Sequence, residues 1–301
     1  MPIEAVNSRH REAALAFICG GGRKDVCTQA KVQVLLELVR SRDSRYVRLW
    51  WSRFWLTCRA AAMVVENPGR TGMVFFPPAH GPQVNLQAQQ RLLEAISGDA
   101  IKAGLSVVQA LLSPEARQDS RMLIDAGYST LAELIYMRKE TQPGAVDLRG
   151  LTWRFHGQFD DAHLAGVIES TYAQSLDCPM LYGRRKMKDI IAGHKAAGLF
   201  CPQQWHVVYR NDEPAGCVLV NDVPEHRGAE IVYLGVCPAH RGRGIAATLL
   251  QRANAEAHRR GRQWLTLAVD ANNRYAKNVY ISEGFREIDR RVALAMLAPA
   301  R

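Results

Sequence analysis

The feature that most constrains this chain is a strand-like run that enters a turn rich in glycine and arginine and continues into a helix. The segment reads Leu234-Gly235-Val236-Cys237-Pro238-Ala239-His240-Arg241-Gly242-Arg243-Gly244-Ile245-Ala246-Ala247. Glycine lets the backbone approach an anion closely, and the first amides of a helix have no partner within the helix. Because the helix dipole is positive at this end and two arginines lie in the turn, the segment predicts a site for a phosphate-like anion.

Alternation and turn residues on both sides of this segment predict a mixed α/β domain. We expect strand, two helices, three strands, helix, strand, helix and strand over residues 151–159, 161–172, 187–197, 205–209, 215–220, 230–236, 245–260, 265–269, 273–283 and 285–294. An antiparallel meander followed by one strand–helix–strand unit gives a mixed sheet.

The chain has 301 residues, a length that corresponds to about two ordinary domains. The clearest break is the turn at Pro143-Gly144, so we predict domains over residues 1–145 and 146–301. The first domain repeats nearly the same order of helices and strands and ends in a predicted strand at 131–137. This order suggests a duplicated fold.

Composition excludes several classes of protein. The apolar fraction of 48% and the charged fraction of 23% exclude a disordered chain. No run approaches the roughly 18 apolar residues of a membrane helix, and we expect no signal peptide and a cytoplasmic location. The seven cysteines are odd in number and form no Cys-x-x-Cys pair, and the histidines lack zinc-ligand spacing, so we expect neither a disulfide framework nor a metal. The net charge of +10 is compatible with nucleic acid or with a polyanionic cofactor.

Two motifs in the second half resemble the signatures of the GNAT superfamily of acetyl-CoA-dependent acetyltransferases. They are Arg241-x-x-Gly244-x-Ala246 and Asn273-x-x-Ala276-x-x-x-Tyr280-x-x-x-Gly284-Phe285. The resemblance covers residues 151–294. It implies an α/β fold with two GNAT-like domains in tandem, each a mixed, mostly antiparallel sheet flanked by helices, in which residues 146–301 form an N-acetyltransferase domain.

The resemblance also implies how acetyl-CoA would bind as a co-substrate. The backbone of Leu234, Gly235 and Val236 would pair with the pantetheine arm, and Asn273 would bind the same arm. The pyrophosphate would lie against the turn and the first helical turn, formed by Arg241, Gly242, Arg243, Gly244, Ile245, Ala246 and Ala247.

Acetyl transfer to an amine requires an acid for the departing thiolate and a group that accepts the amine proton. The resemblance assigns the acid to Tyr280; the alternative is a tyrosine that only packs between helix and sheet. Glu230 lies in an Ala-Glu-Ile-Val context that resembles the base-bearing strand of histone-acetylating relatives. It is the candidate base, directly or through a water molecule, with attraction of a cationic substrate as the alternative.

The acceptor is expected to be an amine on a small molecule or a peptide, contacted by the segment that joins the first two helices of the second domain. The candidate acceptor residues there are Glu169, Tyr172, Asp177 and Tyr182. Small amines, antibiotics, peptide N-termini and protein lysines all remain open as acceptors.

The N-terminal domain is predicted to be a degenerate, structural copy. When Ala126-Gly127-Tyr128 is placed over Glu283-Gly284-Phe285, Leu123 and Ala116 take the positions of Tyr280 and Asn273. Prolines follow its strand at 72–76 and remove amide donors. Such a copy could replace a dimer partner.

Two other functions stay open. One is an acyl-CoA-binding pseudoenzyme or regulator. The other is a nucleic-acid-associated protein that uses the arginines and aromatic residues of segment 40–55, which we regard as the less favoured hypothesis. We expect no membrane association.

Overall fold

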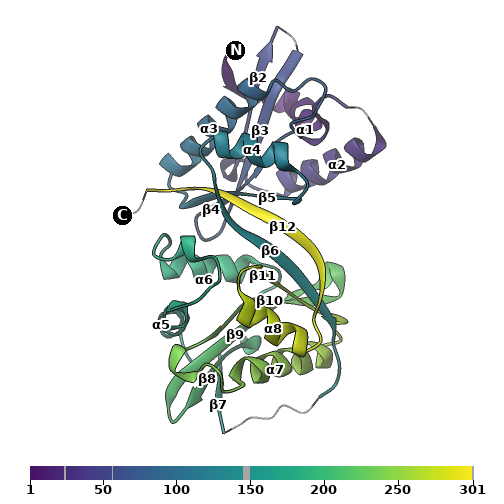
Figure 1. The fold of residues 1–301 in the computed structure, drawn as a ribbon. Helices are drawn as coiled ribbons and strands as arrows, with labels where there is room; N and C mark the ends of the chain where they lie inside the picture. The colour runs from purple at the N-terminus through teal and green to yellow at the C-terminus, as the bar shows by residue number, and fades with distance from the viewer. Residues whose placement is uncertain (24, 56, 145–149, 300–301) are drawn as a thin grey trace. The chain divides into compact units, whose positions relative to one another are not determined.

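The structure is a computed structural model that describes residues 1–23, 25–55, 57–144 and 150–299. It divides into two compact units (Figure 1). Unit 1 comprises Met1–Leu131 and Val292–Arg301, and unit 2 comprises Ala132–Arg291. The fold class predicted from the sequence, mixed sheets flanked by helices, is confirmed.

Unit 2 contains a mixed sheet. Its strands lie in the order β12-β6-β11-β10-β9-β8-β7, and among the pairs whose register is described only β10 and β11 run parallel. Its elements are β6 (Ser129–Glu140), β7 (Thr152–Phe155), α5 (Asp161–Tyr172), α6 (Met187–Ala196), β8 (Trp205–Arg210), β9 (Glu213–Val223), β10 (Gly228–Val236), α7 (Ile245–Arg259), β11 (Trp264–Asp270), α8 (Arg274–Ser282) and the first part of β12 (Arg286–Leu297).

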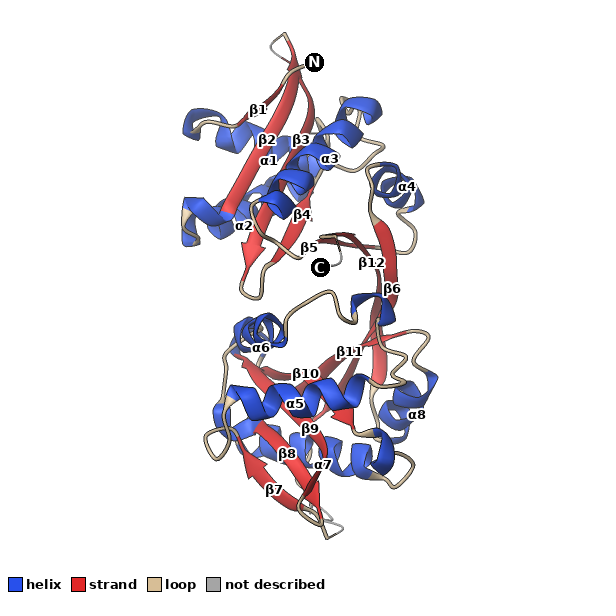
Figure 2. Cartoon of the chain, turned by 90° about the vertical axis from the view of Figure 1, so that its left-hand side faces the viewer, coloured by secondary structure: helices blue, strands red, loops and turns tan. Residues whose placement is uncertain are grey.

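Helices cover both faces of this sheet because alternate strand residues point to opposite sides. On one face α7 and α8 bury a cluster that includes Ile231 and Leu249. On the other face α5 and α6 bury a second cluster that includes Leu164, Ile191 and Trp205 (Figure 2). The sheet is therefore the middle layer of three.

Unit 1 has the same three layers. Its strands lie in the order β1-β2-β3-β4-β5-β12, with α3 and α4 burying one cluster and α1 and α2 burying another. Its elements are β1 (Ile3–Ala5), α1 (Arg11–Gly20), α2 (Val26–Ser41), β2 (Val47–Phe54), β3 (Thr57–Asn67), β4 (Thr71–Phe75), α3 (Leu86–Lys102), β5 (Val107–Leu112), α4 (Arg117–Asp125) and the last part of β12.

A buried side chain completes the unit 1 sheet where β4 ends. The pairing of β4 with β3 stops at Met63. Beyond it, Gln89 of α3 accepts a hydrogen bond from the amide of Ala61 at 3.0 Å and donates one to its carbonyl at 3.0 Å. Both residues are fully buried. Gln89 thus takes the place of a strand partner for a backbone that water cannot reach.

The division of the chain differs from the predicted domains 1–145 and 146–301; residue 145 itself lies outside the described residues. Segment 131–137, expected to close the first domain, lies within β6, which pairs with β11, and all of it but Leu131 belongs to unit 2. The end of β12, expected in the second domain, pairs with β5 of unit 1. Each unit therefore completes its sheet with a strand from the other half of the sequence. Alternation identifies a strand but not the edge it joins.

Within the described ranges, no helix combines the length and the apolar character needed to cross a bilayer. Those ranges also hold no group of three or more side chains arranged to bind a metal ion. All seven cysteines are free thiols.

Candidate active site

The site is built where β10 separates from its parallel neighbour β11. The two strands pair only over residues 228–230, whereas β10 pairs with β9 along its whole length. Past that point the β11-facing edge of β10 has no strand partner in the part of the sheet that is described. Amides and carbonyls on such an edge can pair with an extended ligand as an added strand would. This edge carries the three residues whose backbone is predicted to pair with the pantetheine arm, Leu234, Gly235 and Val236.

The free edge leads into a turn with two glycines in the left-handed region. Gly242 has a φ of 72° and Gly244 has a φ of 77°. Gly244 is the N-cap of α7 and supplies no side-chain hydrogen bond to the helix. The first amides of α7 are therefore not capped by a side chain, and they lie where the helix dipole is positive. They belong to the predicted residues Ile245, Ala246 and Ala247.

Arg241 does not hold its side chain free for an anion. Its Nε donates to the carbonyl of Val236 at 3.1 Å, and one terminal nitrogen donates to the carbonyl of Thr171 at 2.9 Å. The other terminal nitrogen lies 3.5 Å from the carbonyl of Gln174. The guanidinium thus binds backbone at the end of β10 and at the end of α5. The neighbouring Arg243 is exposed.

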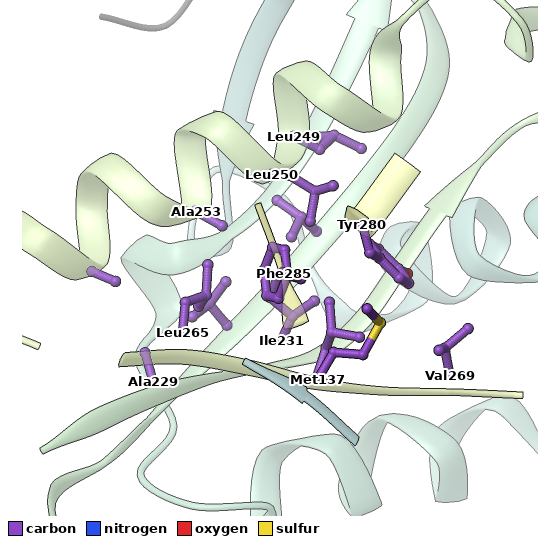
Figure 3. Packing of buried hydrophobic residues seen from close by; sticks show 14 of the residues in the cluster. Met137, Ala229, Ile231, Leu249, Leu250, Ala253, Leu265, Val269, Tyr280 and Phe285 are labelled. Carbon is purple, nitrogen blue, oxygen red and sulfur yellow. The ribbon is translucent and has the colours of Figure 1, made fainter. Parts of the chain in front are cut away.

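Tyr280 lies on α8 at the margin of the cluster between α7 and the sheet (Figure 3). Its side chain is 7% exposed, and its ring centroid lies 5.9 Å from that of Phe285. Burial raises the pKa of the Tyr280 phenol, and the nearby charge of Asp177 raises it further. The phenol is therefore protonated at neutral pH and able to donate a proton.

Asp177 joins the predicted acceptor segment to the end of β11. Its Oδ1 accepts a hydrogen bond from the amide of Asp270 at 3.2 Å, and the Asp270 Oδ2 accepts one from the amide of Cys178 at 3.2 Å. Desolvation of the Asp177 carboxylate raises its pKa, and the charge of Asp270 acts in the same direction. Asn273 hydrogen-bonds Asp177 and caps α8 by accepting from the amide of Ala276 at 3.3 Å. The structure thus brings Asp177, Asn273 and Tyr280 together.

Two of the other predicted acceptor residues pack against each other. The rings of Tyr172 and Tyr182 stack with centroids 5.2 Å apart and planes 12° apart. The Tyr182 hydroxyl donates to the carbonyl of Asp177 at 2.7 Å. Glu169, by contrast, is exposed on α5. Sequence reasoning missed Tyr233, whose ring lies edge-on to Tyr172; its position on β10 directly before Leu234 was a signal that could have identified it.

Glu230 is half-buried on β10, and burial raises the pKa of its carboxyl group. Its strand neighbours Ala229 and Ile231 belong to the cluster that contains Tyr280. Because successive side chains alternate, Glu230 points to the opposite face of the sheet. Burial raises the pKa of Tyr136 on β6, and the charge of Glu230 raises it further. Sequence reasoning missed Tyr136 because it was assigned to the other domain. The candidate acid and base thus lie on opposite faces of the sheet, and β10 separates from β11 directly after Glu230.

In unit 1, side chains already hydrogen-bond the amides of the corresponding turn, which precedes α3. The N-cap of α3 is Asn85, whose side chain accepts from the amide of Ala88 at 2.9 Å. The amide of Ala79 donates to Asp119 at 2.6 Å. The recesses identified in unit 1, of about 600 and 800 Å³, are lined elsewhere and contain none of these groups.

Most arginines of segment 40–55 are held by acceptors within unit 1. Arg48 bonds Glu66 and Asp99, and Arg53 bonds Glu4 while lying over the ring of Trp51. The remaining pairs are Arg42 with the carbonyl of Glu66 and the side chain of Asn67, and Arg45 with Asp43. Three of these arginines, Arg45, Arg48 and Arg53, are therefore paired with carboxylates of unit 1.

Comparison with known proteins gives the same fold over the whole chain. A GCN5-related N-acetyltransferase from Sphaerobacter thermophilus superimposes with a TM-score of 0.65 and 20% identity, over 99% of this chain and 95% of that one. A tandem GNAT protein from the clavulanic acid biosynthesis pathway superimposes with a TM-score of 0.51 and 14% identity, over all of both chains. These likenesses establish the fold.

Comparison by sequence finds a match within the second half of the chain. Residues 171–285 match the acetyltransferase (GNAT) family. A curated relative, the mycothiol acetyltransferase of Jonesia denitrificans, is 34% identical over 96 residues, which is 31% of this chain and 31% of the relative. The matched residues 171–285 all lie in unit 2, and the chain spans about a third of the length of the curated relative that it matches.

Proposed function

We propose that unit 2 transfers the acetyl group of acetyl-CoA to an amine acceptor by direct attack. The observation that supports this most strongly is the free edge of β10, which ends at the uncapped first turn of α7. An extended arm and an anionic group joined to it match these two features, and members of the GNAT family use acetyl-CoA. Acetyl-CoA supplies an acetyl thioester when it is bound.

In this proposal the backbone of Leu234, Gly235 and Val236 holds the pantetheine arm, and the amides of α7 hold the pyrophosphate. The left-handed backbone of Gly242 and Gly244 exposes those amides to the ligand. Arg243 adds positive charge at the mouth of the turn.

Two groups on opposite faces of the sheet carry out the two proton transfers. Glu230 accepts the proton of the attacking amine, directly or through a water molecule, and Tyr280 donates a proton to the departing thiolate. The raised pKa of Glu230 makes it a better proton acceptor. Tyr280 carries its proton at neutral pH, although its raised pKa makes it a weaker acid than an ordinary phenol. Asp177, beside the stacked pair of Tyr172 and Tyr182, would face a cationic acceptor.

We assign no cofactor site to unit 1. The side chain of Asn85 occupies the helix terminus at which a pyrophosphate would bind, so the role of unit 1 is structural. On this view unit 1 takes the place that a partner subunit would have.

Calorimetric titration of acetyl-CoA tests where the ligand binds. We expect micromolar-range binding by the wild type and loss of binding in Gly244→Glu, because the carboxylate would occupy the anion site. Gly261→Glu is a matched control: Gly261 also has a left-handed backbone, with a φ of 70°, but it lies just beyond the other end of α7. Equal binding by both variants, or none by the folded wild type, would contradict the assignment.

Turnover with a panel of amines tests the chemistry. Tyr280→Phe keeps the ring that packs on Phe285, so we expect unchanged acetyl-CoA affinity and a kcat lower by about 10²–10⁴-fold. Glu230 must be ionised, so kcat/KM should rise with pH through its raised pKa, and Glu230→Gln should remove this rise. Binding without turnover of any amine would favour the acyl-CoA-binding pseudoenzyme instead.

A further inference from the structure

The side chain of Arg241 joins three pieces of backbone that are distant in sequence. It donates to Val236 at the end of β10, to Thr171 in the last turn of α5, and reaches Gln174 just beyond that helix. The last carbonyls of a helix lack partners within the helix and carry the negative end of its dipole, so a guanidinium is a well-matched donor there. Arg241 therefore fixes the end of α5 against the turn of the candidate site.

The end of α5 is also packed closely onto β10 by other contacts. A Cβ at Gly235 would lie 2.6 Å from Thr171 Oγ1, and the Thr171 hydroxyl also hydrogen-bonds the hydroxyl of Tyr233. The Ser170 hydroxyl lies 3.2 Å from the Cys237 sulfur. There is little room for this helix end to shift once Arg241 is in place.

The segment that follows α5 depends on where that helix ends. Tyr172 is the last residue of α5 and stacks on Tyr182, so residues 173–183 form a loop closed by two aromatic rings. The loop reaches the end of β11 through Asp177 and Cys178. A displacement of the end of α5 would carry this loop away from Tyr280.

We propose that Arg241 is a positioning residue that aligns the acceptor segment, residues 173–183, with the cofactor turn, and that it is not a direct ligand of the pyrophosphate. The proposal rests on the proposed function and deepens it. Removal of the Arg241 donors releases the acceptor segment, so recognition of the amine suffers more than binding of acetyl-CoA. The signature position Arg241 thus acts mainly on the second substrate.

Hydrogen exchange of the free protein tests this without any turnover. The amides of Ser175, Cys178 and Leu181 are hydrogen-bonded within or at the ends of the acceptor segment, to Tyr172, Asp270 and Cys178 respectively. In Arg241→Met, which keeps the aliphatic stem, we expect these amides to exchange about 10-fold faster or more, which corresponds to about 1.4 kcal/mol of lost protection. Amides of β8 and β9 should keep their wild-type rates.

Two further variants show whether faster exchange in Arg241→Met comes from the lost hydrogen bonds or from the loss of any positive charge. Arg241→Gln retains an amide donor and should restore part of the protection. Arg259→Met removes an arginine whose side chain is 69% exposed on α7, and should leave exchange in the segment unchanged. If Arg241→Met does not fold, the comparison of Arg241→Gln with the wild type decides the question.

Affinity measurements complete the test. The proposal expects Arg241→Met to raise the amine KM at least 10-fold while changing the acetyl-CoA Kd by less than about 3-fold. Unchanged exchange together with a 10-fold weaker acetyl-CoA Kd would identify Arg241 as a phosphate ligand and overturn the proposal. If the wild type binds no acetyl-CoA, the proposed function fails, whereas the exchange result still decides whether Arg241 orders the segment.

Discussion

Gly235 is the position in β10 where one added methyl group should disturb the site most. A Cβ there would lie 2.6 Å from Thr171 Oγ1, 2.8 Å from Thr171 Cβ and 2.9 Å from the Tyr233 hydroxyl, where ordinary contacts are 3.4–4 Å. Thr171 cannot retreat easily, because its hydroxyl donates to the carbonyl of Ile168 at 2.6 Å and its own carbonyl is held by Arg241. We therefore expect Gly235→Ala to force α5 away from β10.

The magnitude follows from the overlap. Inserting a methylene-sized group into a packed interior costs about 1–3 kcal/mol of folding free energy. The Cβ of Gly235→Ala would make three contacts below 3.0 Å with Thr171 and Tyr233, so we expect a cost in the upper half of that range. For a unit of this size, about 1 kcal/mol lowers Tm by roughly 2–4 °C, so we expect a decrease of about 4–12 °C.

Thermal unfolding followed by circular dichroism measures this effect. The matched control is Gly166→Ala in α5, where a Cβ meets no atom within 4 Å and the helical backbone accepts alanine. That control should raise stability by about 0.4–1 kcal/mol. A Gly235→Ala protein that melts within 1 °C of the wild type would refute the close packing of α5 on β10 and the argument about Arg241 that depends on it.

Three other predictions address the rest of the molecule. Gln89→Leu should destabilise unit 1 by roughly 2–6 kcal/mol in denaturant unfolding, because two buried β3 backbone groups lose their partner at about 1–3 kcal/mol each. Asp222 has its pKa lowered: desolvation opposes the shift, but hydrogen bonds from Arg262 and Arg260 prevail. The ionised Asp222 therefore stabilises the folded state fully above its unfolded pKa of about 3.9, and this stabilisation is lost as the pH falls through the lower folded pKa. The difference in unfolding free energy between the wild type and Asp222→Asn should accordingly shrink below about pH 4. A fragment of residues 1–145 should fail to fold alone as judged by cooperative melting, since it lacks the part of β12 that pairs with β5; cooperative melting of this fragment would contradict the strand exchange.

Local features of the site could be predicted from the sequence because they depend on residues close together in the chain. The glycines before α7 permit the left-handed backbone that the turn requires, and Tyr280 falls on the buried side of a short helix. The alternation of Ala229, Glu230 and Ile231 places the candidate base on one face of β10. Such periodic patterns also sufficed for the order of helices and strands and for the fold class.

Contacts between segments distant in sequence could not be predicted in this way. From the sequence, Arg241 is expected to bind a phosphate, but in the structure it hydrogen-bonds the end of α5. Asn273 is expected to bind the cofactor arm, but in the structure it caps α8 and hydrogen-bonds Asp177. In both cases a polar side chain finds a partner that no spacing rule identifies, because the partner is brought there by packing of other elements.

The amino-acid sequence by itself indicated the mixed α/β fold class, the position of the glycine-rich turn and the chemical types of the candidate acid and base. The tertiary structure alone decided which edge each strand joins. The backbone groups that pair strands are the same for every residue type, so the residues of β6 and β12 do not by themselves specify the neighbouring strand. The last strand of the chain therefore pairs with β5 of unit 1, and β6, from the first half of the sequence, pairs with β11 of unit 2.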